Sequence, residues 1–155
     1  MKNYASELHV RDNRGRVPTH LSERPASIAG LLHDMGKFDS AFQRDLRRRL
    51  IATQKIARVL GVPMPDVVDM LGVDKDSLLQ RRGPRHTVAA RRLKEMLEIL
   101  QRVEAWAGGP RAALSWYRAY PIPALGNRTA ESLVKTGGAS AVRDYLDHVA
   151  LGGYA

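Results

Sequence analysis

Apolar positions along the chain recur at the three-to-four-residue spacing of helices, and nowhere do they alternate long enough to indicate a strand. The clearest case is residues 88–106, where arginine, lysine and glutamate occupy one face. The opposite face is apolar at positions i, i+4, i+7, i+8, i+11 and i+14: Ala89, Leu93, Met96, Leu97, Leu100 and Val103. This spacing predicts a long amphipathic helix, and the whole pattern predicts an all-α fold.

The pattern before this helix predicts a leader followed by shorter helices. Residues 1–26 are polar, carry two prolines and a glycine, and show no sustained period, so we expect a flexible leader. Residues 27–50 keep helical spacing in one or two segments. Residues 51–60 predict a short helix that ends at Gly61, because glycine suits the left-handed position just past a helix.

The segment VPMPDVVDMLGVDKDSLLQRRGPR, residues 62–85, indicates a helix, a tight turn and a second helix. Gly72 permits the sharp turn, and Asp74 can cap the second helix by accepting hydrogen bonds from its first amides. We therefore expect a helical region over residues 27–87 whose core, at about residues 51–83, resembles a helix-turn-helix.

Residues 88–155 predict a small, separate helical domain. Gly108 and Gly109 end the long helix, and Pro110 suits the first turn of the next one. The prolines and glycine of residues 121–127 predict an extended loop, after which Thr129 can cap another helix. A last helix places four side chains on one face: Val142, Tyr145, Leu146 and Val149.

Composition narrows the class of protein. The chain of 155 residues has no cysteine, which excludes disulfides and thiolate metal sites. It has no apolar run of about 20 residues and no apolar N-terminal core typical of a signal peptide, so we expect a cytoplasmic protein. The net charge of +9 is concentrated in residues 1–58, with twelve basic against six acidic residues. That excess could attract nucleic acid or an acidic protein, or could simply form a solvated basic face.

The stretch GLLHDMGKFDSAF contains an adjacent His33–Asp34 pair that resembles the metal-binding signature of the HD phosphohydrolases. Such a site needs several histidine and aspartate ligands converging from different helices. The remaining histidines lie in the leader or in segments assigned to another domain: His9, His20, His86 and His148. We therefore interpret His33 and Asp34 as surface residues of an amphipathic helix and reject them as metal ligands.

From about Val59 to Ala155 the chain resembles the Xre/MbcA/ParS family of antitoxins, whose shared region is a toxin-binding domain. Four runs carry the resemblance, in order and at natural spacings: VVDMLGVDKDSLLQRR, RRLKEMLEILQRVEAWAGGPRAALSWY, PIPALGNRTAESLV and VRDYLDHVALGGYA. The resemblance implies that the partner is a RES-domain toxin, an enzyme that degrades NAD or transfers its ADP-ribose. It also implies that the C-terminal segment of the antitoxin covers the NAD-binding cleft of the toxin.

On this resemblance we expect Val149 to Ala155 to be the blocking segment, with Tyr154 and the terminal carboxylate as plug groups, because a phenol ring fills a nucleotide pocket with little loss of conformational entropy. Aromatic side chains at helical spacing are nevertheless core residues more often than interface residues. We expect Arg128 to fasten its own loop rather than to contact the toxin. The predicted toxin-binding residues are Trp106, Trp116, Tyr120, Arg128, Tyr145, Val149, Leu151, Gly152, Gly153, Tyr154 and Ala155.

Antitoxins of this family commonly repress their own operon. Here the second helix of the motif would begin Asp74-Lys75-Asp76, and carboxylates at that end repel the DNA phosphates that supply most of the affinity. Tentative DNA contacts are Lys75, Gln80, Arg81, Arg82, Arg85, Arg47 and Arg48. A helix-turn-helix that serves only packing or dimerisation is the alternative, and we expect a homodimer within a hetero-oligomer.

No nucleophile, base and orienting group occur together at a spacing typical of catalysis, so we expect neither an enzyme nor a resident cofactor. Two other classes stay open. One is a fragment of an HD-type metal phosphohydrolase, and the other is a stand-alone helix-turn-helix transcriptional regulator.

Overall fold

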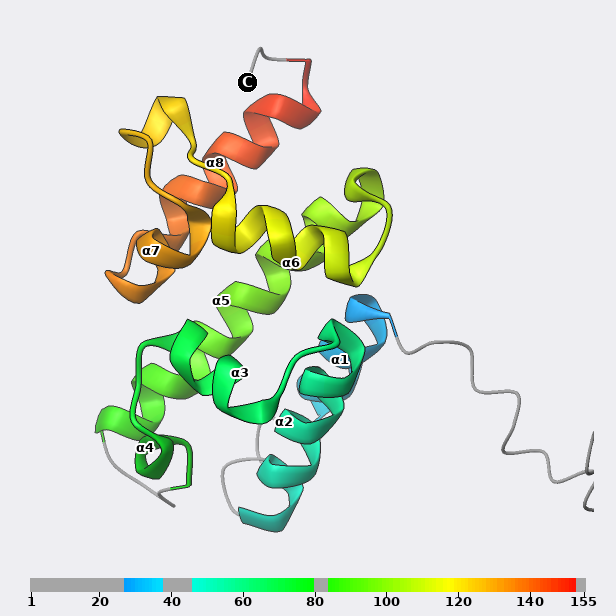
Figure 1. Cartoon of the computed structure of the whole chain (residues 1–155), viewed down its shortest axis with the longest axis vertical. Helices are drawn as coiled ribbons and strands as arrows, with labels where there is room; N and C mark the ends of the chain where they lie inside the picture. The colour runs from blue at the N-terminus through cyan, green and yellow to red at the C-terminus, as the bar shows by residue number, and fades with distance from the viewer. Residues whose placement is uncertain (1–26, 38–45, 80–83, 153–155) are drawn as a thin grey trace, which may run out of the picture.

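The computed structural model describes residues 27–37, 46–79 and 84–152, and these residues confirm the all-α fold. The elements in chain order are α1 (Ile28–Lys37), α2 (Leu46–Leu60), α3 (Met64–Leu71), α4 (Lys75–Leu79), α5 (Pro84–Ala107), α6 (Pro110–Ala119), the 3₁₀ turn η2 (Pro123–Leu125), α7 (Ala130–Lys135) and α8 (Ala139–Ala150) (Figure 1). Extended pairing among the described residues amounts to one isolated bridge between Ile122 and Arg128. None of the described helices is long and apolar enough to cross a membrane.

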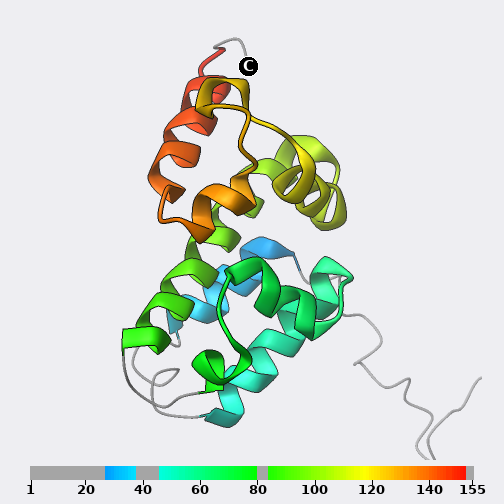
Figure 2. The same cartoon turned by 60° about the vertical axis from the view of Figure 1, so that its left-hand side comes forward.

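The long helix α5 runs through the whole molecule. Helices α1 to α4 lie around one end of α5, and α6 to α8 lie around its other end (Figures 1 and 2). This helix confirms the predicted amphipathic segment, but it begins at Pro84 rather than at residue 88. The earlier start has a local reason, because the fixed φ of proline suits the first turn of a helix.

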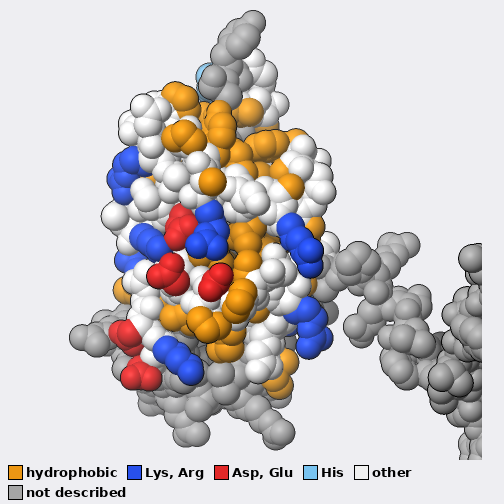
Figure 3. Space-filling model, in the orientation of Figure 1, with side chains coloured by type: hydrophobic (Ala, Val, Ile, Leu, Met, Phe, Trp, Pro, Cys, Tyr) orange, Lys and Arg blue, Asp and Glu red, His pale blue; other side chains and the backbone are white. Residues whose placement is uncertain are grey.

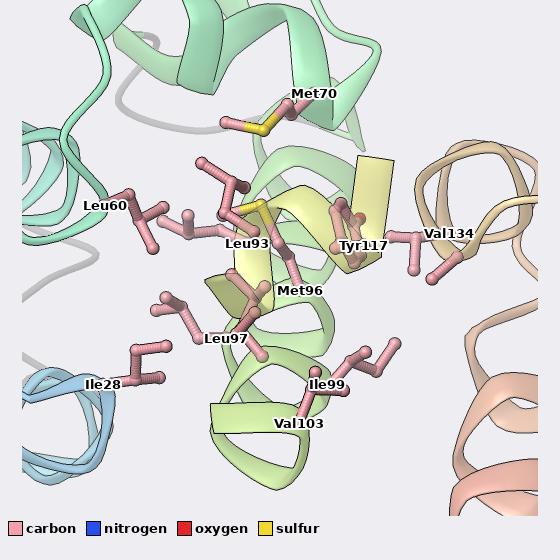
Figure 4. Packing of buried hydrophobic residues seen from close by; sticks show 14 of the residues in the cluster. Ile28, Leu60, Met70, Leu93, Met96, Leu97, Ile99, Val103, Tyr117 and Val134 are labelled. Carbon is pink, nitrogen blue, oxygen red and sulfur yellow. The ribbon is translucent and has the colours of Figure 1, made fainter. Parts of the chain in front are cut away.

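The hydrophobic core is built on the apolar face of α5. Leu93, Met96 and Leu97 are buried at its centre, with Ile28 and Leu60 on one side and with Tyr117, Val134 and other side chains of α6 and α7 on the other (Figure 4). Fully burying one such side chain stabilises the fold by roughly 1.5–3 kcal/mol. One continuous apolar cluster therefore ties the two ends of the molecule together.

The predicted turns among the first helices are largely confirmed. Helix α2 begins at Leu46, five residues before the start of the predicted 51–60 segment, and has no break at Ile51. It ends before Gly61, which adopts φ +70° as expected. Gly72 adopts φ +59° after α3, and Asp74 Oδ1 accepts a hydrogen bond of 2.7 Å from the amide of Ser77. The sequence therefore located both the turn and the cap of α4.

One local prediction was wrong. The segment after α6 was expected to be an extended loop, but Pro123–Leu125 form the 3₁₀ turn η2. The carbonyl of buried Ile122 accepts hydrogen bonds from the amides of Leu125 and Asn127, at 3.0 and 2.9 Å. These two bonds close the segment into a compact turn, after which Thr129 caps α7 as predicted, its hydroxyl accepting from the Ser132 amide at 3.2 Å.

A cluster of ion pairs joins α3 to α6 and α7, and thus links the two ends of the molecule. Glu131 accepts from Lys135 at 2.7 Å and lies 3.4 Å from Arg118, and its side chain is only 13% exposed. The same two cations also approach α3, with Lys135 3.9 Å from Asp69 and Arg118 3.9 Å from Asp66. Charged side chains of both signs gather where α3, α6 and α7 meet (Figure 3).

Candidate functional site

A hollow of about 760 Å³ opens between the end of α5, the outer face of α6 and the last turns of α8. Its walls are mostly apolar and aromatic, and they come from the consecutive helices α5 and α6 and from α8, which follows later in the chain. The lining residues are Arg102, Ala105, Trp106, Trp116, Tyr120, Tyr145, Leu146, Asp147, Val149 and Ala150.

An aromatic row forms one side of the hollow. Trp116 lies on α6 and Tyr120 directly follows its last residue, and their rings stack with centroids 5.8 Å apart. Trp106, at the end of α5, meets Trp116 edge to face with centroids 5.9 Å apart. Such pairs are favourable beyond the area they bury, so they hold the three rings in a fixed arrangement.

The opposite side of the hollow is formed by α8. Burial, followed by the neighbouring Tyr120 and its hydrogen bond, raises the pKa of the Tyr145 phenol, which therefore stays neutral and protonated at physiological pH. At the rim, Arg102 and Asp147 form an ion pair, and Arg102 also donates to the backbone carbonyl of Arg143 at 3.3 Å. The rim thus carries one charge of each sign, paired with each other.

The structure brings together five of the predicted toxin-binding residues: Trp106, Trp116, Tyr120, Tyr145 and Val149. The exposed fractions of Trp106 and Tyr120 are 57% and 38%, so these rings are surface residues rather than core residues. Sequence reasoning missed Arg102, Ala105, Leu146 and Asp147, whereas Ala150 lies within the predicted blocking segment. Arg102 lies four residues before Trp106, and Leu146 lies three residues before Val149, so helical spacing places each pair on a shared face. Ala105 and Asp147 lie only one and two residues from the predicted aromatic residues, so this spacing gave no signal for them.

Arg128 lies outside the hollow and fastens its own segment, as expected. Its guanidinium donates to the Ser132 carbonyl at 3.0 Å and to the Thr136 hydroxyl at 2.7 Å. These bonds tie the residues before α7 to its C-terminal end, where carbonyl groups lack helical partners.

The predicted blocking segment begins at the edge of the hollow. Val149 and Ala150 line it, and Leu151 follows with 88% of its surface exposed. Gly152 takes φ +86°, which turns the chain away from the axis of α8. Gly153, Tyr154 and Ala155 lie outside the described residues.

The helix-turn-helix-like segment leaves much of the tentative DNA contact set unplaced. Lys75 is exposed at the start of α4, next to exposed Asp76. Asp74 is occupied with capping, because its Oδ1 accepts from both the amide and the hydroxyl of Ser77. The other tentative contacts, or their side chains, lie outside the part of the chain that the structure describes: Gln80, Arg81, Arg82, Arg85, Arg47 and Arg48.

His33 is exposed on α1, and the side chain of Asp34 lies outside the described part of the chain. Within that part, no group of three or more histidine, aspartate or glutamate side chains could hold a metal ion.

Comparison with known proteins bears on the same region. Residues 102–152 match the family described as the antitoxin Xre/MbcA/ParS C-terminal toxin-binding domain, and every residue that lines the hollow lies inside this range. No curated protein and no solved structure matches the chain. The similarity therefore covers residues 102–152, about a third of the chain, and concerns the toxin-binding domain of the Xre/MbcA/ParS antitoxins.

Proposed function

We propose that the chain is the antitoxin of a type II toxin–antitoxin system and neutralises a RES-domain toxin, an enzyme that degrades NAD or transfers its ADP-ribose. In this proposal Val149–Ala155 cover the NAD-binding cleft of the toxin. The observation that carries it is the exposed apolar end of α8 within the domain that matches antitoxin toxin-binding domains. The chain itself has a regulatory role and performs no catalysis.

The end of α8 is suited to enter a cleft of another protein. Leu151 is 88% exposed, and Gly152 is also exposed and donates its amide to the Val149 carbonyl at 3.0 Å. A partner can therefore take up this segment without breaking packed core, so little free energy is spent in releasing it. Tyr154 would add a ring and a phenol hydroxyl, which together match the apolar and polar parts of a nucleotide pocket.

Co-expression tests the proposal. A RES-domain enzyme encoded beside this gene should be toxic alone and harmless together with the intact chain, with cellular NAD as the readout. Ending the chain after Ala150 keeps all of α8 and should restore NAD loss. The matched control replaces residues 151–155 by a glycine-serine segment of equal length. If the chain that ends at Ala150 protects NAD as well as the intact chain does, the blocking mechanism is wrong.

A second proposal concerns the helix-turn-helix-like segment, which the sharp turn at Gly72 and the exposed Lys75 favour. The antitoxin would repress its own operon as a homodimer, because a dimer presents two such motifs to successive half-sites. A gel shift with the upstream DNA, repeated from 50 to 200 mM salt, should show steeply weakening affinity. Binding that requires no toxin and a chain that does not protect NAD would favour a stand-alone regulator instead.

A further inference from the structure

The aromatic hollow lies in a part of the surface where large apolar side chains are left uncovered. Among the described residues, the exposed large hydrophobic side chains are Ile51, Trp106, Tyr120 and Leu151. Trp106 and Tyr120 line the hollow, and Leu151 directly follows the lining residue Ala150. Hydrophobic side chains also gather over the end of the molecule formed by α6 and α8 (Figure 3). A contiguous exposed apolar surface of this kind is typical of a protein-binding site.

The chemistry of the walls defines what fits inside. The two charged groups at the rim, Arg102 and Asp147, neutralise each other, and the Tyr120 side chain lies beside that of Tyr145. The remaining wall offers ring faces and the apolar side chains of Ala105, Val149 and others. A charged group that entered the hollow would meet no unpaired charge of opposite sign among these lining residues. The hollow therefore fits an apolar side chain, aliphatic or aromatic, that projects from another protein.

The hollow lies next to the blocking segment, and this position indicates which protein supplies the apolar projection. Five residues, 151–155, reach at most about 18 Å when fully extended. A standard protein interface buries roughly 800 Å² on each partner, which corresponds to a patch about 30 Å across. A protein that holds this segment in a cleft therefore also extends over the hollow, because the segment starts at its edge.

We propose that the aromatic hollow is the main docking site of the toxin, that it takes an apolar projection of the toxin, and that residues 151–155 block the cleft but add less to the affinity. This inference rests on the proposed function. It assigns most of the binding energy to the hollow and the blocking of the cleft to residues 151–155. Aromatic side chains at the centre of an interface commonly dominate its binding energy.

The chain carries a built-in reporter for this proposal, because its tryptophan count is two and both tryptophans line the hollow. Incorporating 5-fluorotryptophan gives two ¹⁹F signals, and the unlabelled toxin contributes none. We expect both signals to shift when the neighbouring RES-domain toxin is added to the intact chain. They should also shift with the chain that ends at Ala150, which binds but does not protect NAD.

The affinity of each variant for the toxin, measured by calorimetry, separates docking in the hollow from long-range electrostatic attraction. Ala105→Arg adds a long charged side chain to the wall of the hollow at an exposed position of α5. The control, Gln54→Arg, adds the same charge at an exposed position of α2, at the other end of the molecule. We expect about 30-fold weaker binding for Ala105→Arg and a change of less than about twofold for Gln54→Arg. Trp106→Ala removes a ring that is 57% exposed and should also weaken binding, while circular dichroism verifies that each variant is folded.

The outcomes distinguish the two proposals. If the intact chain does not bind the toxin, both fall. If it binds and protects NAD but the folded Ala105→Arg variant binds equally well, only the docking proposal is overturned. Loss of binding in the chain that ends at Ala150 would overturn the division of roles. Signals that shift with the concentration of the chain alone would assign the hollow to a second copy and overturn the proposal as well.

Discussion

The buried Tyr117 hydroxyl allows a quantitative test of the packing between α6 and its neighbours. The side chain is fully buried, and the oxygen has no hydrogen-bond partner among the described residues. Tyr117→Phe removes this oxygen and keeps the ring. Because an unsatisfied buried hydroxyl costs about 1–3 kcal/mol, we expect the free energy of unfolding at pH 7 to rise by about 1–2 kcal/mol. The melting temperature should rise by roughly 4 °C, at about 2–4 °C per kcal/mol for a chain of this size.

The same oxygen predicts a pH dependence. Burial, followed by the charges of Glu131 and Glu95, raises the pKa of Tyr117 above its ordinary value. The stability contributed by the protonated phenol is therefore complete below about pH 10, where the unfolded phenol titrates, and is lost as the pH rises above it. At pH 11 the loss in the wild type amounts to about 1.4 kcal/mol, and the phenylalanine variant avoids it.

Urea unfolding followed by circular dichroism at 222 nm, at pH 7, 9, 10 and 11, measures both effects. The advantage of Tyr117→Phe should widen by about 1.4 kcal/mol between pH 9 and pH 11. The control is Tyr120→Phe, which removes a phenol oxygen from a ring that is 38% exposed and should not raise the free energy of unfolding at pH 7. Parallel curves for wild type and Tyr117→Phe from pH 9 to 11 would refute the reasoning.

Three further substitutions test the contacts that position α7. Glu131→Gln removes the shared anion of Arg118 and Lys135 and should cost about 1–2 kcal/mol in urea unfolding, with a smaller cost in 1 M salt. Thr129→Ala removes the cap of α7 and should cost about 1 kcal/mol. Gly72→Ala forces a left-handed conformation on alanine and places its Cβ 2.9 Å from Lys135 Cγ, so we expect a cost of about 1–2 kcal/mol in thermal unfolding.

Each of these substitutions has a matched control in the chain. Glu98→Gln removes a carboxylate that is more exposed, at 34%, and should cost less than Glu131→Gln. Ser115→Ala removes a hydroxyl from the middle of α6 rather than from a cap. Gly126→Ala has φ +71° but meets no atom within 4 Å, so it should cost less than Gly72→Ala. Equal costs within any of these pairs would contradict the assigned contact.

Local physical chemistry alone placed most of the helices of this chain. The 3.6-residue period of Leu93, Met96 and their neighbours predicted the buried face of α5, and all of these residues are buried. The capping roles of Asp74 and Thr129 followed from residue type and position, and both hydrogen bonds are present. Where local signals conflicted, prediction failed: proline and glycine in residues 121–127 permitted either an extended or a tightly turned path, and the burial of Ile122 selected the turn.

The sequence by itself thus determined the all-α fold, the ends of most helices, and which aromatic residues merit attention as contacts. Only the tertiary structure decided that Trp106 on α5, Trp116 on α6 and Tyr145 on α8 line one hollow, and that Trp106 is exposed rather than in the core. The physical reason is that helical periodicity assigns a residue to a face of its own helix. Which face of another helix it meets depends on how the helices cross, and that is set by packing of the whole core around α5.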